Sequence, residues 1–502
     1  MRTSRAVLAS VSTAILLTTP LAAQTTLMYQ PTALGTIGGD SSEAYAINDF
    51  GQIVGRAQDS NDESHIFHWQ NGQMHALLYE NLWGRRTLPT ALYSVGYGIS
   101  NTDHIVGTFL EPYEPDPQIT VQRGVIFSPG TSSDDTTPYP GELIVEFETL
   151  GAATGISPNG RYVVGWMNVE DSQIRGIVLE ARDGTWSDPR NLSALDAPVQ
   201  SSSATAVNDS GQVVGWTYSA THGYAAFLIT PLESDDDEHR WHEDADGDGA
   251  NDLMISLGTL GGTNSWARAI NSRGWIVGEA DTADWYTQAF IWVDGQMTDL
   301  GTLGGSNSSA SGINDQGVVV GWALDSAGRR RAFVVHPDDT DGDGLADQWF
   351  LDEDGDGRND LMSDLNNLLP SGFSMRLTDA RDVNESGQIV GWGETGSGNS
   401  VLHLAFLLEP VAAVAGATGA AGVRADATLE PIIGTPNNIP PDASDPNADT
   451  TVDDDTSQTG GATRLGLFHF LCGMGIIVAW PAALAGLCGL KLGLRHYYRR
   501  AR

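Results

Sequence analysis

Three segments of the sequence repeat the spacing D-x-D-x-D-G-x-x-D, which places four carboxylates within nine residues. The aspartates are Asp244, Asp246, Asp248 and Asp252, then Asp339, Asp341, Asp343 and Asp347, and finally Asp352, Asp354, Asp356 and Asp360. Glycine at the sixth position of each segment permits a sharp turn, so the alternate carboxylates point inward together. Hard oxygen ligands in such a loop suit Ca²⁺, and the spacing therefore predicts three calcium loops.

The predicted loops lack the bidentate acid that a strong calcium site has at its twelfth position. Ile255, Phe350 and Ser363 stand there instead. Asp352 could serve the middle loop as well as its own, and the expected dissociation constants are weak, about 10⁻⁴–10⁻³ M. A solvated acidic loop without an ordered ion is the alternative. A catalytic pair is disfavoured, because glycosidase carboxylates need unequal environments on either side of a sugar.

The three segments resemble the calcium loops of EF-hand proteins. The offset of 13 residues between Asp339 and Asp352 is also similar to that of thrombospondin type 3 repeats. The resemblance implies Ca²⁺ as the bound ion.

The elements that must position these loops belong to a repeat. The pattern I/V-N-x-x-G-x-x-V-G occurs at 47–55, 207–215, 270–278, 313–321 and 383–391, with degenerate copies at 99–107 and 156–165. Each unit predicts four short strands, whose hairpins contain Asn-Gly or Asp-Gly where positive φ is needed. About 40–50 residues per four-stranded unit is the size of a propeller blade. We expect an all-β, seven-bladed propeller over 24–410; a β-solenoid or another blade count is the alternative.

The two ends of the repeat region complement each other. The last unit has no fourth strand of its own, whereas 32–39, "TALGTIGG", matches the fourth-strand motif "DLGTLGG" before the first complete unit. We therefore predict that the N-terminal strand completes the last blade and closes the ring.

The acidic loops lie in two inserts, at 231–254 and 338–362. Both follow a third strand and precede a fourth, which for the second insert is expected at 361–369. Alignment of the inserts superposes Trp241 on Trp349 and Asp244 on Asp352. They are two copies of one calcium-loop module in an outer hairpin.

The repeat resembles the extracellular HAF-repeat family, which is named for a His-Ala-Phe third strand. The third strands here read "HIFHW", "GVIFSP", "GIVLE", "YAAFLI", "QAFIW", "RAFVV" and "LAFLL", and "LGTLGG" and "INDQGVVVGW" match well. The similarity covers about 33–410. It implies an exported repeat protein without a general activity.

The remaining segments predict export and a membrane anchor. Residues 1–23 have the basic start and apolar centre of a signal peptide. An Ala-, Pro- and Asp-rich stretch at 411–463 is expected to be a disordered stalk. The apolar run at 464–494 is long enough for a transmembrane helix, and the basic tail at 495–502 is expected on the cytoplasmic side. Processing by a sorting system is the alternative to a permanent span.

Composition and motifs limit the possible partners. The formal net charge of −38 argues against nucleic acid. The sequence has no phosphate-binding loop, which argues against a nucleotide, and its glycines fall at repeated turns. The predicted partners are the membrane and a polysaccharide or protein ligand.

Other repeated residues favour structural roles. Trp166, Trp216, Trp322 and Trp392 follow the second-strand "VG" and are expected to fill space between blades; a stacking platform for sugar is the alternative. Asn48, Asn208, Asn271, Asn314 and Asn384 precede the first turn, where an amide can cap the backbone. His65, His68, His75 and His104 show no metal spacing with Cys or Glu, so packing or surface roles are expected.

These observations leave two candidate functions. The first is a non-enzymatic binding or adhesion scaffold displayed at the cell envelope. The second is a propeller hydrolase acting on extracellular glycans, which requires polar residues that converge at the ring's mouth. Only Arg56, Asp103 and Glu279 depart from the repeat in that way. The scaffold is therefore favoured, without catalytic residues.

Overall fold

The computed structural model describes residues 28–77, 93–113, 116–128, 142–146, 151–169, 173–195, 201–219, 223–233, 239–397 and 400–411. The predicted signal peptide, transmembrane helix and basic tail lie outside these residues, and so does the stalk after Val411. Within the described ranges, no helix has the length and apolar character needed to span a bilayer. The described chain is all-β, as the sequence predicts.

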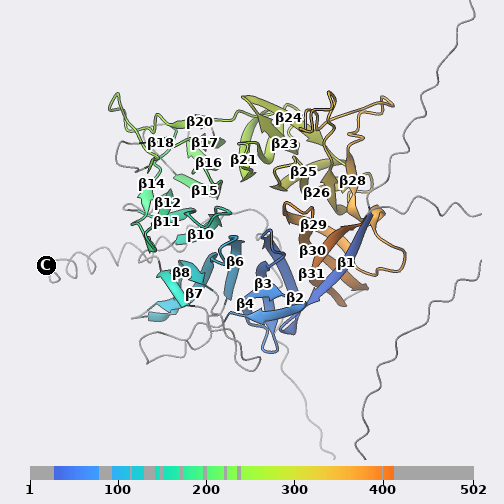
Figure 1. The fold of residues 1–502 in the computed structure, drawn as a ribbon, viewed down its shortest axis with the longest axis horizontal. Helices are drawn as coiled ribbons and strands as arrows, with labels where there is room; N and C mark the ends of the chain where they lie inside the picture. Colours follow the sequence, from blue (N-terminus) through green and yellow to red (C-terminus); the bar gives the residue numbers. More distant parts are fainter. Residues whose placement is uncertain are drawn as a thin grey trace, which may run out of the picture. The chain divides into compact units, whose positions relative to one another are not determined.

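Most of the described strands form antiparallel meanders that follow chain order (Figure 1). One four-stranded sheet holds β21 (Gly261–Ile270), β22 (Ile276–Thr282), β23 (Thr287–Val293) and β24 (Gln296–Gly301). The next holds β25 (Gly304–Ile313), β26 (Val319–Asp325), β27 (Arg330–Val335) and β28 (Met362–Asp364). A third holds β15 (Ser201–Val207), β16 (Val213–Ser219), β17 (Gly223–Ile229) and β20 (Met254–Ser256).

Two further sheets precede these along the chain. The eight-stranded sheet contains β2 (Gly38–Ile47), β3 (Ile53–Asp59), β4 (Ser64–Gln70), β5 (Gln73–Ala76), β6 (Tyr93–Ile99), β7 (Ile105–Tyr113), β8 (Asp116–Ser128) and β9 (Glu142–Glu146). It consists of two four-stranded meanders joined by a single parallel bridge between Ser64 and Tyr93. The five-stranded sheet contains β10 (Gly151–Ile156), β11 (Tyr162–Asn168), β12 (Ile174–Arg182), β13 (Thr185–Trp186) and β14 (Arg190–Asn191).

The two ends of the described chain meet in one sheet. This sheet combines β29 (Arg376–Val383), β30 (Ile389–Ser397) and β31 (Ser400–Val411) with β1 (Met28–Gly35). β1 pairs antiparallel with β31, from Met28 opposite Val411 to Gly35 opposite Ala405. Figure 1 shows the blue β1 beside the orange β31. The predicted pairing of an N-terminal strand with the last unit is therefore confirmed, but its bounds differ. The paired strand is 28–35, and Gly38 and Gly39 of the predicted segment 32–39 belong to β2.

The repeated "VG" requires glycine because a side chain at this position would clash with the facing strand. In β21 the register shifts between Ala267 and Ala269, which makes a bulge. A Cβ on Gly278, in the facing strand, would overlap the carbonyl oxygen of Trp266. Gly55, Gly107, Gly165, Gly215, Gly321 and Gly391 meet a first-strand carbonyl in the same way. The signature thus records a bulge in the first strand of every unit.

The turns after the first strands are capped by the predicted asparagines. The Asn271 Oδ1 accepts the backbone N–H of Arg273 at 3.1 Å and that of Trp275 at 3.0 Å. Its Nδ2 donates to the Asn314 carbonyl of the next sheet at 3.0 Å. The amide therefore caps its own turn, as predicted, and also links two sheets, which the sequence did not reveal.

These links run from turn to turn and return to their start. In five steps of the circuit, the side-chain amide of an asparagine donates to a backbone carbonyl in the turn of the next unit. The donors and acceptors are Asn48 to Ser100, Asn208 to Asn271, Asn271 to Asn314, Asn314 to Asn384, and Asn384 to Asn48. Asn101 N–H to the Pro158 carbonyl and Asn159 N–H to the Asp209 carboxylate join two further pairs. In three of the turns the circuit enters and leaves at adjacent residues: 100 and 101, 158 and 159, and 209 and 208. The hydrogen bonds make a closed circuit through seven turns.

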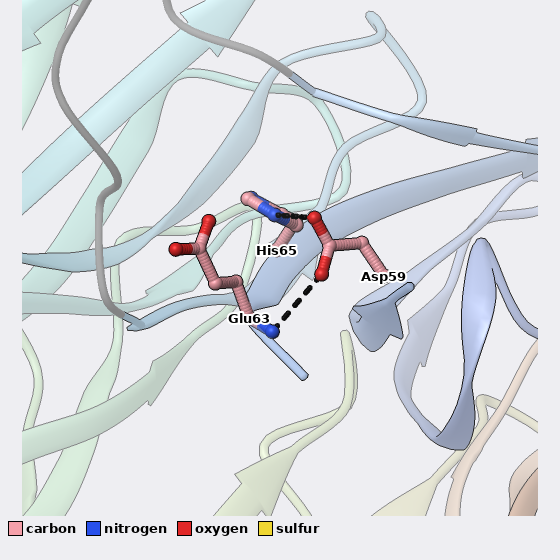
Figure 2. A group of neighbouring side chains, drawn as sticks. All are labelled: Asp59, Glu63 and His65. Carbon is pink, nitrogen blue, oxygen red and sulfur yellow. Dashed lines mark hydrogen bonds and ion pairs between the residues drawn. The ribbon is translucent and has the colours of Figure 1, made fainter. Parts of the chain in front are cut away.

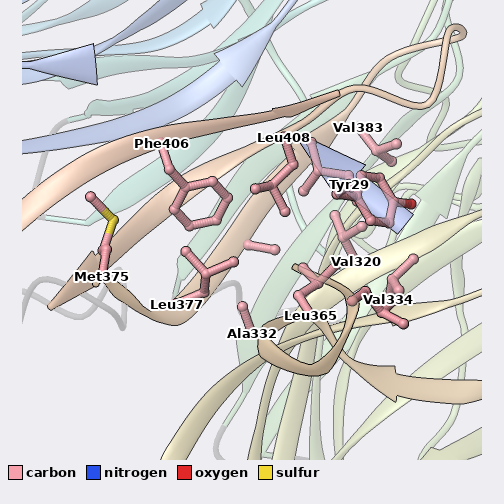
Figure 3. Close-up of a cluster of buried hydrophobic side chains, with 13 residues drawn as sticks. Tyr29, Val320, Ala332, Val334, Leu365, Met375, Leu377, Val383, Phe406 and Leu408 are labelled. Atoms are coloured by element: carbon pink, nitrogen blue, oxygen red, sulfur yellow. The ribbon is translucent and has the colours of Figure 1, made fainter. Parts of the chain in front are cut away.

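The apolar core is divided into clusters between neighbouring sheets. Figure 3 shows one of them, in which Tyr29 from β1 packs with Leu408 of β31 and with Val334 of β27. Val320, Leu365 and Leu377 belong to the same cluster. Since Tyr29 is only 1% exposed, the strand that joins the chain ends also fills the space between two sheets.

One predicted strand is wrong in extent. Residues 361–369 were expected to form a fourth strand, but β28 ends at Asp364 and a 3₁₀ helix, η2 (Leu365–Leu368), follows. The Asp364 carboxylate accepts the N–H of Asn366 and caps this helix. Leu365 and Leu368 are buried by the turn. A local cap therefore overrides the strand pattern.

Candidate metal centre

Both acidic inserts lie where the repeat predicts them. The first separates β17 from β20 and contains the two short strands β18 (Leu232–Glu233) and β19 (His239–Arg240). The second separates β27 from β28. Each insert thus occupies the hairpin between the third and fourth strands of its sheet.

A buried tryptophan fixes each insert to the first turn of its own sheet. Trp241 is 2% exposed and its Nε1 donates to the Gly211 carbonyl at 2.7 Å. Trp349 is also buried and donates to the Gly317 carbonyl at 2.8 Å. Buried indole N–H groups need such a partner. The inserts therefore lie at the end of the sheets that carries the asparagine turns.

A buried asparagine ties each insert to the preceding sheet. Asn251 Nδ2 donates to the carbonyl of Leu192, which follows β14, and to that of Trp241, both at 2.8 Å. Asn359 Nδ2 donates in the same way to Leu300 of β24 at 3.1 Å and to Trp349 at 2.7 Å. Each module consequently bridges two neighbouring sheets. Its backbone is anchored on both sides of the acidic loop.

The three acidic loops have the same internal hydrogen bonds. In the third loop, the Asp352 carboxylate accepts Gly355 N–H at 2.8 Å and Gly357 N–H at 3.0 Å. The first and second loops repeat both bonds at Asp244 and Asp339. The second and third aspartates of each loop accept the N–H two residues later. Three separate segments thus share one folded form.

Oxygens of three aspartates come together in each loop. The groups, whose ligand atoms lie within 4.8 Å of one another, are Asp244/Asp246/Asp248, Asp339/Asp341/Asp347 and Asp352/Asp354/Asp356. Such groups could hold a metal ion.

Asp252, Asp343 and Asp360 lie outside these groups, although they were predicted as ligands. Asp252 accepts Ala245 N–H, Asp343 accepts Leu345 N–H, and Asp360 accepts Glu353 N–H. Asp352 is grouped within its own loop and not with the middle one.

A fourth group was missed by the sequence interpretation. Asp59, at the end of β3, lies near Glu63, which directly precedes β4, and near His65 in β4; one ligand atom from each falls within 4.8 Å of the others. Figure 2 shows the three side chains gathered over the turn. His65 was expected to have only a packing or surface role. Asp59 lies across a hairpin turn from His65, whereas Glu63 is two residues before it.

The residues that depart from the repeat do not form one site. Asp103 lies in the turn between β6 and β7, at the end of the sheets that carries the inserts. Arg56 and Glu279 instead pair with strand neighbours: Arg56 Nη2 with Glu43 at 2.5 Å and Glu279 with Arg268 Nη2 at 2.5 Å. The predicted trio is therefore split.

A polar cluster nevertheless spans several sheets. The Tyr45 hydroxyl donates to Glu43 Oε2 at 2.7 Å, and the Arg381 guanidinium lies 5.6 Å from the Tyr45 ring centroid. Burial lowers the pKa of Arg381, but Asp379, Tyr45, Glu43 and Glu279 raise it by more. Burial raises the pKa of Glu43, but Arg56, Tyr45 and Arg381 together outweigh it and hold the pKa below its usual value. Side chains from three sheets thus converge electrostatically.

One tryptophan contact in this cluster crosses between sheets, whereas the stacking of tryptophans on arginines lies within a sheet. Trp392 of β30 lies 5.8 Å from the Tyr45 ring of β2, centroid to centroid, and stacks on Arg381 at 4.3 Å. The Arg330 guanidinium carbon lies over the Trp322 ring, 4.0 Å from its centroid. For Trp392, the prediction of a role between sheets agrees with the geometry.

Comparison with known proteins places the chain in no family. No family model matches it, and no curated protein matches it. Solved structures give distant similarities. The β-propeller domain of the trilobed protease from Pyrococcus furiosus has 11% identity and a TM-score of 0.41, over 75% of this chain and 98% of that domain.

Two further structures are similar at the same low level. TolB from Acinetobacter baumannii has 12% identity and a TM-score of 0.33, over 58% of this chain. This chain spans 62% of TolB, less than two thirds of its length. Trypanosoma rangeli sialidase has 10% identity and a TM-score of 0.34, over 76% of this chain and 59% of the sialidase. These similarities assign neither activity nor ligand to the chain.

Proposed function

We propose that the chain is an exported, membrane-anchored, calcium-binding propeller of seven blades that serves as a surface binding or adhesion scaffold. The seven capped turns and the strand shared by the two chain ends support the blade count. The proposal that the chain binds calcium rests on the hydrogen bonds that the three acidic loops share. Sequence pattern supports export and anchoring.

Calcium would act as a rigid link within each module. The asparagine and tryptophan anchors already bridge neighbouring sheets, whereas the loop between them concentrates like charges. A bound divalent cation would offset this repulsion and hold the loop to its anchors. A stiffened, acidic outer rim is suited to a display scaffold in a calcium-rich medium.

The double variant Asp352→Asn/Asp354→Asn is expected to weaken calcium binding in the second module by about tenfold or more, because two carboxylate ligands lose their charge. The loop at Asp244 should bind as before. Calorimetric titration of the purified chain measures both. At calcium tenfold above the dissociation constant, each intact site should stabilise the fold by ~1.4 kcal/mol.

Asp284→Asn supplies the matched control, because it removes a charge from an exposed turn outside the inserts. Equal calcium affinity in the control and in the double variant would contradict the assignment of these ligands.

The membrane anchor has its own test. If residues 464–494 span the membrane, the intact chain should remain with the membrane fraction after washes with salt and alkali. Intact chain in the soluble fraction would contradict the anchor.

A hydrolase acting on glycans is the second candidate, and the Tyr45–Glu43 pair favours it. A phenol bonded to a carboxylate beside arginines could act as a nucleophile, as in glycosidases that use tyrosine. Against this, Glu43 and Asp379 are ion-paired, which opposes a role as general acid. A glycan array with calcium, scored for retained protein and for released sugar, separates the two functions. Sugar release that Tyr45→Phe abolishes would favour the hydrolase.

A further inference from the structure

The turn between β3 and β4 carries an imidazole and two carboxylates at one place (Figure 2). We propose that Asp59, Glu63 and His65 bind a divalent transition-metal ion, with Zn²⁺ the best match. This site is independent of the acidic inserts. It differs from them in chemistry, because one of its three ligand atoms is nitrogen.

The separation of two of the three candidate ligand atoms agrees with tetrahedral coordination. His65 Nε2 lies 3.4 Å from Asp59 Oδ2. A tetrahedron with bonds of about 2.1 Å, the usual length for Zn²⁺ with His or carboxylate ligands, has edges of about 3.4 Å. The two atoms are therefore separated as two ligands of one ion should be. Three protein ligands leave a fourth position for water.

The turn also orients one carboxylate. Asp59 Oδ1 accepts Asn61 N–H at 2.8 Å and Glu63 N–H at 3.0 Å. With Oδ1 held by the backbone, Oδ2 faces His65. The Glu63 carboxylate has no hydrogen bond or ion pair within the described part of the chain.

The turn between β26 and β27 has the same backbone hydrogen bond as the turn between β3 and β4, but different side chains. Asp325 takes the place of Asp59, and Asp325 N–H donates to the Arg329 carbonyl at 2.9 Å, just as Asp59 N–H donates to the Glu63 carbonyl. There the two arginines at +4 and +6 neutralise the aspartate, with Arg329 Nε at 2.8 Å and Arg331 Nε at 3.2 Å.

The third copy of the turn needs no carboxylate at all. Thr282 stands at the aspartate position, with Tyr286 and Gln288 at +4 and +6, and Thr282 N–H still donates to the Tyr286 carbonyl at 2.8 Å. The turn itself therefore requires neither Asp59, Glu63 nor His65. Replacing two arginines by Glu and His converts a neutralised aspartate into a set of metal ligands.

The ligand set selects the class of ion. Imidazole with carboxylates suits Zn²⁺ and related transition ions, whereas Ca²⁺ is bound by oxygen alone. The His65 side chain is 12% exposed and that of Asp59 is 23% exposed. An ion could enter from solvent and still be partly shielded.

The double variant Glu63→Arg/His65→Arg tests the proposal, because it installs the residues of the Asp325 turn and should keep the fold. Zn²⁺ titration of the full chain, with calcium saturating the inserts, should give one site that the variant weakens by at least tenfold. Thermal unfolding without Zn²⁺ should be the same for both proteins. Asp352→Asn/Asp354→Asn should bind Zn²⁺ like the unaltered chain.

Two results would overturn the proposal. One is equal Zn²⁺ affinity and stoichiometry in the arginine variant and the unaltered chain. The other is no Zn²⁺ bound to the unaltered chain at micromolar concentration. Loss of Zn²⁺ binding only in the insert variant would count as the first result, since it would place the ion in the acidic loops. Calcium binding is measured separately, so its failure leaves this test intact.

Discussion

Deletion of residues 24–35 is expected to destabilise the whole described fold, because it removes β1 and leaves the β31 edge unpaired. β1 contributes the pairing from Met28 to Gly35 and two buried apolar side chains, Tyr29 and Leu34. Chemical unfolding followed by circular dichroism should show a loss of at least about 5 kcal/mol, more than a large core truncation alone. A truncated chain that unfolds like the full one would contradict closure by β1.

A point variant isolates the packing part of this effect. Tyr29→Ala should lower the free energy of unfolding by about 3–5 kcal/mol, since the ring fills the space between two sheets. Gln30→Ala is the matched control: it lies on the same strand, is exposed, and should change stability by no more than about 0.5 kcal/mol. Similar losses in both variants would mean that the strand, and not the ring, determines stability.

Replacing Asn271 by Ala is expected to cost roughly 3 kcal/mol. Two groups lose their partner at once, the N–H of Arg273 and the N–H of Trp275. The Asn314 carbonyl loses one of its two donors and keeps the N–H of Gly317. Asn271 is 5% exposed, so water cannot fully replace these bonds. Urea titration of variant and unaltered chain measures the difference.

The chain provides its own control for this prediction. Ser100 and Ser157 occupy the equivalent positions, and the Ser100 hydroxyl accepts His104 N–H at 3.1 Å. Serine can therefore cap the turn, but it is too short to reach the next sheet. Asn271→Ser should cost less than Asn271→Ala, and the remaining loss, roughly 1 kcal/mol, reports the link between sheets. Equal stability of Asn271→Ser and the unaltered chain would show that the circuit contributes nothing.

The strands and turns were predictable because local chemistry determines them. Asn-Gly and Asp-Gly pairs mark hairpins, and Asn271 caps its turn through atoms two and four residues away. The pairing of the chain ends was also predictable, since 32–39 repeats a motif that the last unit lacks, although only 32–35 of this segment pair with β31. The Asn271 bond to Asn314 was not predictable, because its acceptor is set by how two sheets pack.

In the candidate metal sites, too, local features were predictable and contacts between distant segments were not. The D-x-D-x-D-G spacing predicts the loop conformation, but Asn251 and Asn359 gave no sign that they tie inserts to the preceding sheet. Asp59 joins Glu63 and His65 only because a hairpin brings the ends of β3 and β4 together. The signal that could have found this group is the alignment of turns, where Glu63 and His65 replace Arg329 and Arg331.

A crystal structure of the chain grown with millimolar calcium tests the central claim most directly. Anomalous scattering identifies bound Ca²⁺, and we expect one ion in each acidic loop, held by Asp244, Asp339 and Asp352 with their partners. The loops themselves should keep their present hydrogen bonds at the glycines. Ordered loops without an ion at that concentration would contradict the account and leave the aspartates as a solvated acidic rim.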